Sequence, residues 1–159
     1  MEFCGGQIYQ LAERLFPICR SITGNGVRQT LNILSEVVPI RQYEVPSGTK
    51  VFDWTVPQEW NIRGGFIEDE SGKRLLDFAW NNLHIVGYSE PVDRTVSKEE
   101  LLEHIYTEPS QPDAIPYVTS YYSRRYGFCM TENQKQMLGD GPFHIVIDSE
   151  LKDGWFTYW

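Results

Sequence analysis

The character of the sequence changes near residue 50, and this change limits what the chain can fold into. Before it, apolar residues recur at intervals of three and four, which is the spacing of a helix with one buried face. This spacing predicts a helix over residues 8–16, ended by Pro17, and a second helix over 27–38. A short strand is expected over 40–45. Two such helices and one strand do not offer one another enough apolar surface to form a core by themselves.

From residue 51 onward the sequence indicates short strands joined by tight turns. Apolar runs at 66–67 and 75–78 flank the turn sequence Asp-Glu-Ser-Gly-Lys at 69–73, which predicts a hairpin. Other strands are expected over 83–88, 128–130, 143–147 and 155–159. The last of these is rich in aromatic rings and nothing follows it. We therefore expect an exposed edge capable of self-association, and an ending cut from a longer chain.

Two short helices complete the predicted fold. Ser97 and Thr131 each stand three residues before a Glu or a Gln, which is the spacing of a capping box at a helix start. The sequence therefore predicts an α+β fold in two parts. Residues 1–49 form a helical lead-in with a first strand, and residues 50–159 form a small, mainly β domain with two short helices and a return strand.

The overall charge argues against a nucleic-acid partner. The chain has 22 acidic and 14 basic residues and a net charge of −8, whereas phosphate binding needs clustered Lys and Arg. No apolar stretch approaches the roughly 20 residues of a membrane helix. There is no signal-peptide pattern, and three scattered cysteines do not make a disulfide framework. We expect a cytoplasmic protein with no membrane partner.

The sequence offers no set of catalytic or metal-binding residues. Zinc sites usually take two ligands that are close in sequence, and no such pair occurs among the histidines at positions 84, 104 and 144. We expect His84 and His144 on the solvent side of strands. Cys129 is interpreted as a small buried hydrophobe, and Cys19 has Arg20 beside it to lower its thiol pKa, which is weak evidence for a nucleophile. We predict no catalytic residue and no metal ligand in this chain.

One segment has two possible interpretations. Residues 21–26, Ser-Ile-Thr-Gly-Asn-Gly, precede the second predicted helix, and helix N-termini bind anions. The segment lacks the Gly-Lys-Ser/Thr ending of a P-loop, and no strand precedes it. A helix cap with glycines in the turn is therefore favoured.

Aromatic residues make up 14% of the chain and concentrate in two irregular, proline-containing segments, 52–61 and 112–122. Such segments form cleft walls or plug the ends of a small β core, and the sequence does not choose between these. We take as candidate substrate-cleft residues Trp54, Trp60, Tyr121, Tyr122 and Arg124. Arg124 can receive a substrate carboxylate or carbonyl through a charge-assisted hydrogen bond.

Several strings together resemble one family. They are Cys-Arg-Ser-Ile-Thr-Gly-Asn-Gly-Val-Arg at 19–28, Glu-Val-Pro-Ser-Gly-Thr-Lys-Val-Phe-Asp-Trp-Thr-Val-Pro at 44–57 and Pro-Asp-Ala-Ile-Pro-Tyr-Val-Thr-Ser-Tyr-Tyr at 112–122, with further matches at 127–129 and 148–154. The chain is similar to the N-terminal part of bacterial and archaeal aminopeptidase-like proteins. In that family an inserted domain of unknown function interrupts a zinc-peptidase domain.

The resemblance implies that the helices and strand up to about residue 45 begin the α/β zinc-peptidase domain, and that residues 50–150 are a lid-like insertion. In the complete protein, zinc would take part in peptide hydrolysis. In similar proteins the residues that bind zinc come after the turn that corresponds to Lys-Asp-Gly at 152–154 of this chain. No metal ligand can therefore be carried onto this chain, and none of its residues is expected to catalyse the reaction alone. Trp155 and Trp159 are bulkier than the family pattern suggests.

The sequence leaves two alternatives open. One is a stand-alone, aromatic-lined module that binds a peptide or a glycan. An exposed cluster of Trp54, Trp60 and Tyr122 would favour it, and burial of those rings would count against it. The other is a structural fragment that associates through the strand at 155–159.

Overall fold

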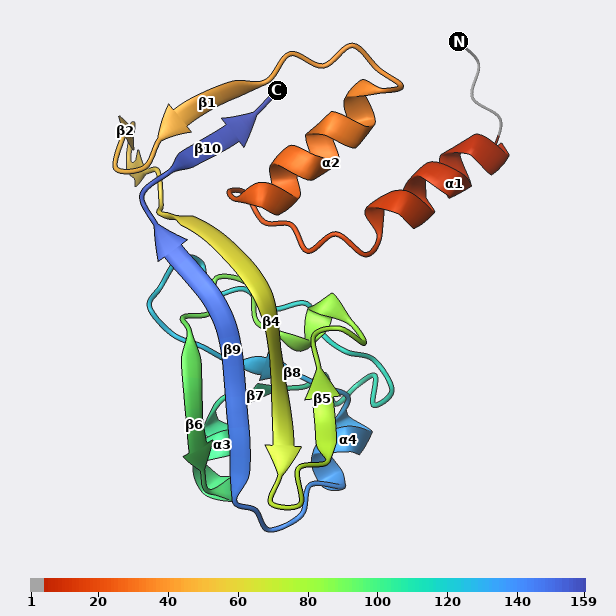
Figure 1. The fold of residues 1–159 in the computed structure, drawn as a ribbon, viewed down its shortest axis with the longest axis vertical. Helices are drawn as coiled ribbons and strands as arrows, with labels where there is room; N and C mark the ends of the chain where they lie inside the picture. Colours follow the sequence, from red (N-terminus) through yellow and green to blue (C-terminus); the bar gives the residue numbers. More distant parts are fainter. Residues whose placement is uncertain (1–4) are drawn as a thin grey trace. The chain divides into compact units, whose positions relative to one another are not determined.

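A computed structural model describes residues 5–159, which belong to two compact units (Figure 1). The first unit comprises the chain up to Asn61 together with Lys152–Trp159, and the second comprises Ile62–Leu151. The fold is α+β, as predicted. The division differs from the predicted one, because residues 50–61 and the return strand belong to the first unit. Two long strands, β4 (Glu59–Asp69) and β9 (Phe143–Lys152), cross the boundary, so the chain passes between units without a linker.

The first unit contains the two predicted helices, α1 (Gly5–Leu15) and α2 (Asn25–Ser35). The expected strand is β1 (Tyr43–Pro46), and β10 (Trp155–Tyr158) pairs with it antiparallel, with Tyr43 opposite Tyr158. A small hairpin joins β2 (Lys50–Val51) and β3 (Trp54–Thr55). The aromatic C-terminal strand therefore has a partner within this chain along one of its edges.

Two glycines allow the start of α2 to form. Gly24 has φ of 92°, and a Cβ there would lie 2.1 Å from the carbonyl oxygen of Trp60. A Cβ on Gly26 would lie 2.0 Å from the carbonyl oxygen of Cys19, so neither position has room for a side chain. The N–H of Asn25 donates to Asn61 Oδ1 at 2.7 Å. The turn is the predicted one, but the capping group comes from β4 and not from within residues 21–26.

The side chain of Glu59, at the start of β4, connects three segments of the first unit. Glu59 is 4% exposed, and both of its oxygens accept hydrogen bonds from the Arg28 guanidinium on α2. Asn61 Nδ2 donates to it at 3.1 Å, and the backbone N–H of Trp155 on β10 donates at 3.2 Å. The hydrogen bonds from Arg28 are the largest cause that lowers the Glu59 pKa, to about 2. The carboxylate is therefore ionised in its buried position because donors surround it.

The second unit is built on one antiparallel sheet with strand order β5-β4-β9-β6, where β5 is Arg74–Asp77 and β6 is Val92–Val96. The predicted hairpin joins β4 to β5, and the turn is closed by a hydrogen bond from Asp69 N–H to the carbonyl of Lys73. The helices α3 (Lys98–Glu103) and α4 (Glu132–Gln136) follow the predicted caps, with a complete capping box at α4.

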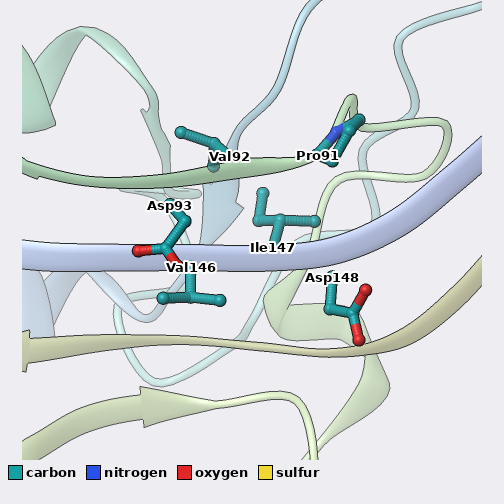
Figure 2. Close-up of a pocket in the computed structure, with 6 residues that line it drawn as sticks. All are labelled: Pro91, Val92, Asp93, Val146, Ile147 and Asp148. Atoms are coloured by element: carbon teal, nitrogen blue, oxygen red, sulfur yellow. The ribbon is translucent and has the colours of Figure 1, made fainter.

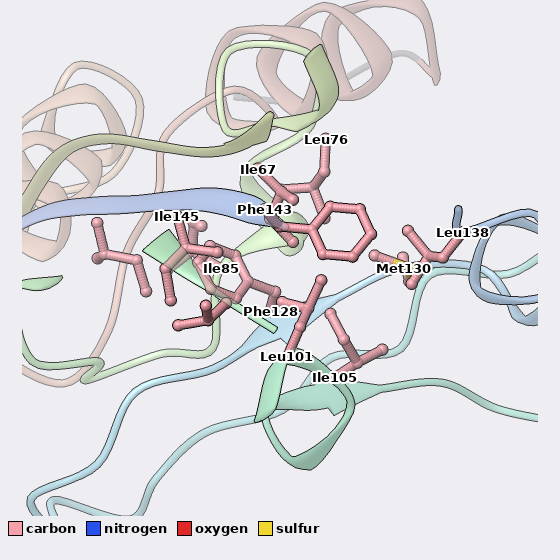
Figure 3. Close-up of a cluster of buried hydrophobic side chains, with 12 residues drawn as sticks. Ile67, Leu76, Ile85, Leu101, Ile105, Phe128, Met130, Leu138, Phe143 and Ile145 are labelled. Atoms are coloured by element: carbon pink, nitrogen blue, oxygen red, sulfur yellow. The ribbon is translucent and has the colours of Figure 1, made fainter. Parts of the chain in front are cut away.

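One face of this sheet packs on the hydrophobic core of the second unit (Figure 3). The short parallel pair β7 (Ile105–Tyr106) and β8 (Phe128–Cys129) lies behind the sheet with α3 and α4 in Figure 1. Apolar side chains from the sheet and from this layer meet in the core, among them Ile67, Leu76, Leu101, Phe128, Met130, Phe143, Ile145 and Ile147. The period of two along β9 is the predicted one, since Phe143, Ile145 and Ile147 are buried and alternate with more exposed residues.

The prediction of a strand over 83–88 is wrong. The Asn81 side chain accepts a hydrogen bond from Leu83 N–H and starts a short 3₁₀ helix, Asn82–His84. His84 does not face solvent, because it is 3% exposed and its Nδ1 lies 2.8 Å from the carbonyl oxygen of Cys129. Burial lowers the pKa of His84. Among the described residues, none of the helices has both the length and the apolar character that crossing a membrane demands.

The ion pair at Glu59 gives a test of the first unit. Replacing Arg28 with Ala leaves the Glu59 carboxylate buried without its cation, and we expect a loss of about 3 kcal/mol in the free energy of unfolding. Urea denaturation followed by tryptophan fluorescence at pH 7 measures this loss. Arg14→Ala is the control, because it removes an exposed pair with Glu36 and should cost at most about 1 kcal/mol.

The pH dependence of the same pair has a defined sign. The folded-state pKa of Glu59, about 2, is below the value of about 4.3 for an unfolded chain. Its stabilisation is therefore complete above the unfolded value and is lost as the pH falls toward the folded value. The stability difference between the wild type and Arg28→Ala should shrink below pH 4. A difference that is constant with pH would contradict the assignment.

Candidate functional site

Residues 118–125, in the segment between β7 and β8 of the second unit, form a loop held at both ends by backbone hydrogen bonds. Gly87 N–H donates to the carbonyl of Val118 at 2.9 Å, and Gly87 O accepts from Ser120 N–H at 2.9 Å. At the other end, Glu90 N–H donates to the carbonyl of Arg125 at 3.0 Å. The residues between these anchors therefore form a positioned turn.

The turn places two consecutive tyrosines in a backbone conformation that residues other than glycine rarely adopt. Tyr121 has φ of 50° and Tyr122 has φ of 69°, both in the left-handed region. Non-glycine residues there cost on the order of 1 kcal/mol or more each, and they are found where the surrounding structure imposes the conformation. The buried ring of Tyr88 contacts Tyr122 edge-on, with centroids 4.8 Å apart. The strained backbone therefore lies at two residues whose side chains the turn exposes.

The displayed side chains are aromatic and cationic, and we name them the tyrosine–arginine surface: Tyr117, Tyr121, Tyr122, Arg124 and Arg125. Tyr117 is 69% exposed and Tyr121 is 77% exposed, while Tyr122 is 39% exposed because it rests on Tyr88. Partial burial raises the pKa of the Tyr122 phenol, and the neighbouring phenols of Tyr117 and Tyr121 add to the effect.

The two arginines are held at the end of this turn. Arg124 Nη1 lies 3.5 Å from Glu90 Oε1, and its side chain is 57% exposed. Arg125 Nη2 donates to the carbonyl of Thr119 at 3.1 Å. The surface offers ring faces, phenol hydroxyls and guanidinium groups, which are chemically suited to binding and not to nucleophilic or general-base chemistry.

The five predicted cleft residues do not all belong to this surface. Tyr121, Tyr122 and Arg124 are in the second unit, whereas Trp54 and Trp60 are in the first. Trp54 is half-buried, with its ring edge-on to Phe156 at 5.6 Å. Trp60 is 3% exposed, and its backbone N–H donates to Thr23 Oγ1 at 3.1 Å. The burial of Trp60 counts against an exposed cluster of Trp54, Trp60 and Tyr122.

The histidines do not form a metal site in the described part of the chain. His144 on β9 is half-exposed, with Nε2 2.8 Å from Asp93 Oδ1 and Nδ1 3.5 Å from Glu68 Oε2. The two carboxylates bind opposite nitrogens of the ring and cannot converge on one ion. No group of three or more His, Cys, Asp or Glu among residues 5–159 is arranged to hold a metal. Residues 5–159 therefore do not fit a zinc centre.

The cysteines give no nucleophile among the described residues. Burial raises the pKa of Cys19 to about 11 and outweighs the effect of Arg20, so the expectation of a lowered pKa is wrong. Cys129 is fully buried, as predicted, and burial raises its pKa to about 12. Both thiols are therefore protonated at neutral pH, and a thiolate is the form that reacts. The remaining cysteine, Cys4, lies outside the described residues.

A surface hollow of about 480 Å³ lies beside β6 and β9 (Figure 2). It is lined by Pro91, Val92, Asp93, Val146, Ile147 and Asp148. Its two carboxylates already have cationic or histidine partners, since Arg63 Nε donates to Asp148 Oδ2 at 2.9 Å and Asp93 is bound to His144. The hollow therefore presents no free charge to a ligand, and we do not treat it as the site.

The second unit corresponds to a known family. Residues 59–150 match the family described as Domain of unknown function (DUF2172), and the chain belongs to this family. The matched range begins in β4 and ends in β9, close to the limits of the second unit at Ile62 and Leu151. The predicted presence of a domain of unknown function is thus confirmed.

Two comparisons extend over nearly the whole chain. A Clostridium acetobutylicum protein, provisionally named as a polysaccharide biosynthesis protein with an aminopeptidase-like domain, is 51% identical over 154 residues, which are 97% of this chain. The crystal structure of a protein from Clostridium acetobutylicum with the provisional name of a peptidase has a TM-score of 0.93, 51% identity, and covers 96% of this chain. In both comparisons this chain spans 36% of the other protein's length. The predicted resemblance to aminopeptidase-like proteins is confirmed at this level.

His144 gives a pH-dependent test of the sheet in the second unit. The hydrogen bond to Asp93 raises the pKa of His144, and the contact with Glu68 adds to this. The stabilisation is therefore complete below the unfolded value of about 6.5 and is lost as the pH rises through the raised folded value. We expect His144→Gln to destabilise the protein more at pH 5.5 than at pH 9. Urea denaturation at both pH values measures this, and an equal or reversed effect would contradict it.

Proposed function

We propose that this chain is the first part of a zinc-dependent aminopeptidase-like protein that hydrolyses peptide-like substrates. The observation that carries the proposal is the match to peptidase-named relatives, which extends over nearly all of this chain but over 36% of the relatives. In this proposal the first unit belongs to the peptidase-like domain, and the DUF2172 domain shapes or covers the substrate cleft. The zinc ligands and the carboxylate that serves as base belong to the remaining length of such proteins.

The helix α1 supports this proposal. Its sequence is amphipathic, but none of its described residues is buried. Ile8 is 57% exposed and Tyr9 is 66% exposed, and Phe16 directly after the helix is 77% exposed. A helix of 11 residues gains most of its stability from packing an apolar face, so this face calls for a covering partner. Further chain of the aminopeptidase-like protein supplies such a partner.

The tyrosine–arginine surface supports a substrate-binding role for the second unit. Tyr121 and Tyr122 provide ring faces in a fixed turn, and Arg124 provides a charge-assisted donor for a substrate carboxylate or carbonyl. Trp54 is a further candidate in the first unit. The net charge of −8 supports a partner other than nucleic acid.

The second candidate function is an aromatic-lined binding module that acts without hydrolysis. The same surface favours it, because ring faces, phenol hydroxyls and guanidinium groups suit binding. A third possibility, self-association through β10, is supported by the exposed rings of Trp155, Tyr158 and Trp159. Hydrolysis by a protein that contains this chain separates the first proposal from the other two.

The test is a chimera in which this chain replaces the matching segment of the Clostridium acetobutylicum protein. We expect the chimera to release p-nitroaniline from aminoacyl-p-nitroanilides, and to lose this activity with a zinc chelator. In the chimera, Tyr121→Asn and Arg124→Ala should each raise KM for peptides about tenfold with little change in kcat, because they remove binding contacts and not reacting groups. Asparagine is chosen because it tolerates the left-handed backbone.

Trp80→Ala is the matched control, because Trp80 is 61% exposed in the second unit but is not part of the surface. Its KM should stay within about twofold of the unsubstituted chimera. The proposed activity is contradicted if the chimera and the Clostridium acetobutylicum protein are both folded and neither cleaves any aminoacyl substrate. An unchanged KM in Tyr121→Asn and Arg124→Ala would instead remove the surface from substrate binding.

A further inference from the structure

The strand β6 is the last strand at one side of the sheet in the second unit (Figure 1). We propose that an extended, basic peptide segment binds here by adding a strand to β6, with an apolar side chain of the peptide in the hollow beside β6 and β9. This inference deepens the proposed function, and it rests on that function only in treating the bound peptide as substrate.

The backbone of β6 has one side without a partner strand. In the order β5-β4-β9-β6 only β9 lies next to it, and no other bridge or backbone hydrogen bond of the described residues reaches 92–96. In an antiparallel ladder, the N–H and C=O groups of every second residue point away from the partner strand. The middle of β6, from Asp93 to Thr95, is exposed. The edge therefore offers the backbone groups with which an extended peptide pairs.

The charged side chains of β6 do not block this edge. Proteins often protect an exposed edge strand with charges that point along it. Here Asp93 Oδ1 lies 2.8 Å from His144 Nε2 on the neighbouring strand β9. Arg94 Nη2 lies 2.5 Å from Glu100 on α3 and 2.5 Å from Tyr126 Oη. Both side chains are thus held by the body of the second unit.

The charge around the edge favours a basic peptide. Residues 90–103, which include β6 and α3, contain five acidic and two basic residues. The Asp93 side chain is 77% exposed, and a carboxylate can accept several hydrogen bonds besides the one with His144. Side chains directly opposite each other on paired strands have Cβ atoms about 5 Å apart. A lysine opposite Asp93 on the added strand can therefore form a charge-assisted hydrogen bond.

The hollow beside β6 and β9 has room for an apolar side chain (Figure 2). Its apolar lining comes from Pro91, Val92, Val146 and Ile147. Because its two carboxylates already have partners, it suits an apolar group and not a charge. Residues two positions apart in a strand lie on the same face, so the residue opposite Pro91 and the lysine opposite Asp93 share one face. The proposed peptide therefore has an apolar residue two positions from a lysine.

The edge also adjoins the tyrosine–arginine surface. Glu90, directly before Pro91 and β6, donates its backbone N–H to the carbonyl of Arg125 at 3.0 Å. Arg94 on β6 contacts Tyr126, which follows Arg125. Strand addition to β6 and binding by the tyrosine–arginine surface are therefore compatible in one peptide substrate.

The experiment is calorimetric titration of the 159-residue chain with the blocked peptide acetyl-Thr-Leu-Thr-Lys-Thr-Leu-Thr-amide. The side-chain order of this lysine peptide is the same in both directions, so leucine stands two positions from lysine whether the added strand is parallel or antiparallel to β6. We expect one-to-one binding. The same peptide with glutamate in place of lysine should bind at least about tenfold more weakly, because a second carboxylate then faces Asp93.

Backbone methylation separates strand addition from binding through side chains alone. One variant of the lysine peptide carries N-methyl groups on both leucines and the lysine, and a second carries them on the last three threonines. Only one of these two sets of N–H groups faces β6 in an added strand. We expect one methylated peptide to lose more than about tenfold in affinity and the other to stay within about threefold of the lysine peptide.

Two substitutions in the chain test the side-chain contacts. Asp93→Asn removes the charge and keeps the shape, so it should weaken binding of the lysine peptide about tenfold and remove its advantage over the glutamate peptide. Val146→Trp fills the hollow and should weaken binding about tenfold. The matched controls at exposed positions of the second unit are Glu70→Gln and Gln111→Trp, which should bind within about twofold of the unsubstituted chain. Circular dichroism of each variant checks that it is folded.

Three results would overturn the inference. They are no binding of the lysine peptide up to about 5 mM, equal losses for the two methylated peptides, and unchanged binding by folded Asp93→Asn or Val146→Trp.

These outcomes are separate from the test of hydrolysis. A chimera that cleaves aminoacyl substrates, together with a chain that does not bind the lysine peptide, keeps the proposed function and rejects strand addition. Binding of the lysine peptide by a chain whose chimera cleaves nothing keeps β6 as a peptide-binding edge and rejects the peptidase activity.

Discussion

The first unit depends on the hydrogen bonds that surround the buried carboxylate of Glu59. Burying a charge is expensive unless donors replace water, and here Arg28, Asn61 and the N–H of Trp155 do so. The consequence is geometric, because these donors come from α2, β4 and β10. The helix start, with its two close-packed glycines, and the return strand are thus fixed around a single side chain at the beginning of β4.

In the second unit, the hydrophobic core and the tyrosine–arginine surface are formed by different side chains. The sheet and the layer of β7, β8, α3 and α4 share one apolar core, so the segment that follows β7 can leave the core without weakening it. Its ends are tied to residues 87 and 90 by backbone hydrogen bonds. A rigid loop that carries exposed tyrosines is therefore compatible with stability, since the cost of two left-handed residues is met by packing elsewhere.

Several elements could be predicted because their causes are local. The period of the helices, the alternation along β9, the turn at 69–73 and the capping box at Thr131 all depend on residues within a few positions of one another. The segment 83–88 could not be predicted in the same way. Its apolar composition suits a strand, but the Asn81 cap and the burial of His84 against Cys129 produce a 3₁₀ helix, and the second of these causes is distant in sequence.

The sequence by itself determined the α+β class, the helices, the local turns and the resemblance to aminopeptidase-like proteins, because periodicity, caps and long motifs are written in neighbouring residues. Only the tertiary structure decided which candidate residues come together. It buried Trp60, left Tyr121 and Arg124 exposed, and placed the carboxylates of Glu68 and Asp93 on opposite sides of His144. Burial and the direction of a side chain depend on contacts between residues far apart in the chain, and no local pattern encodes them.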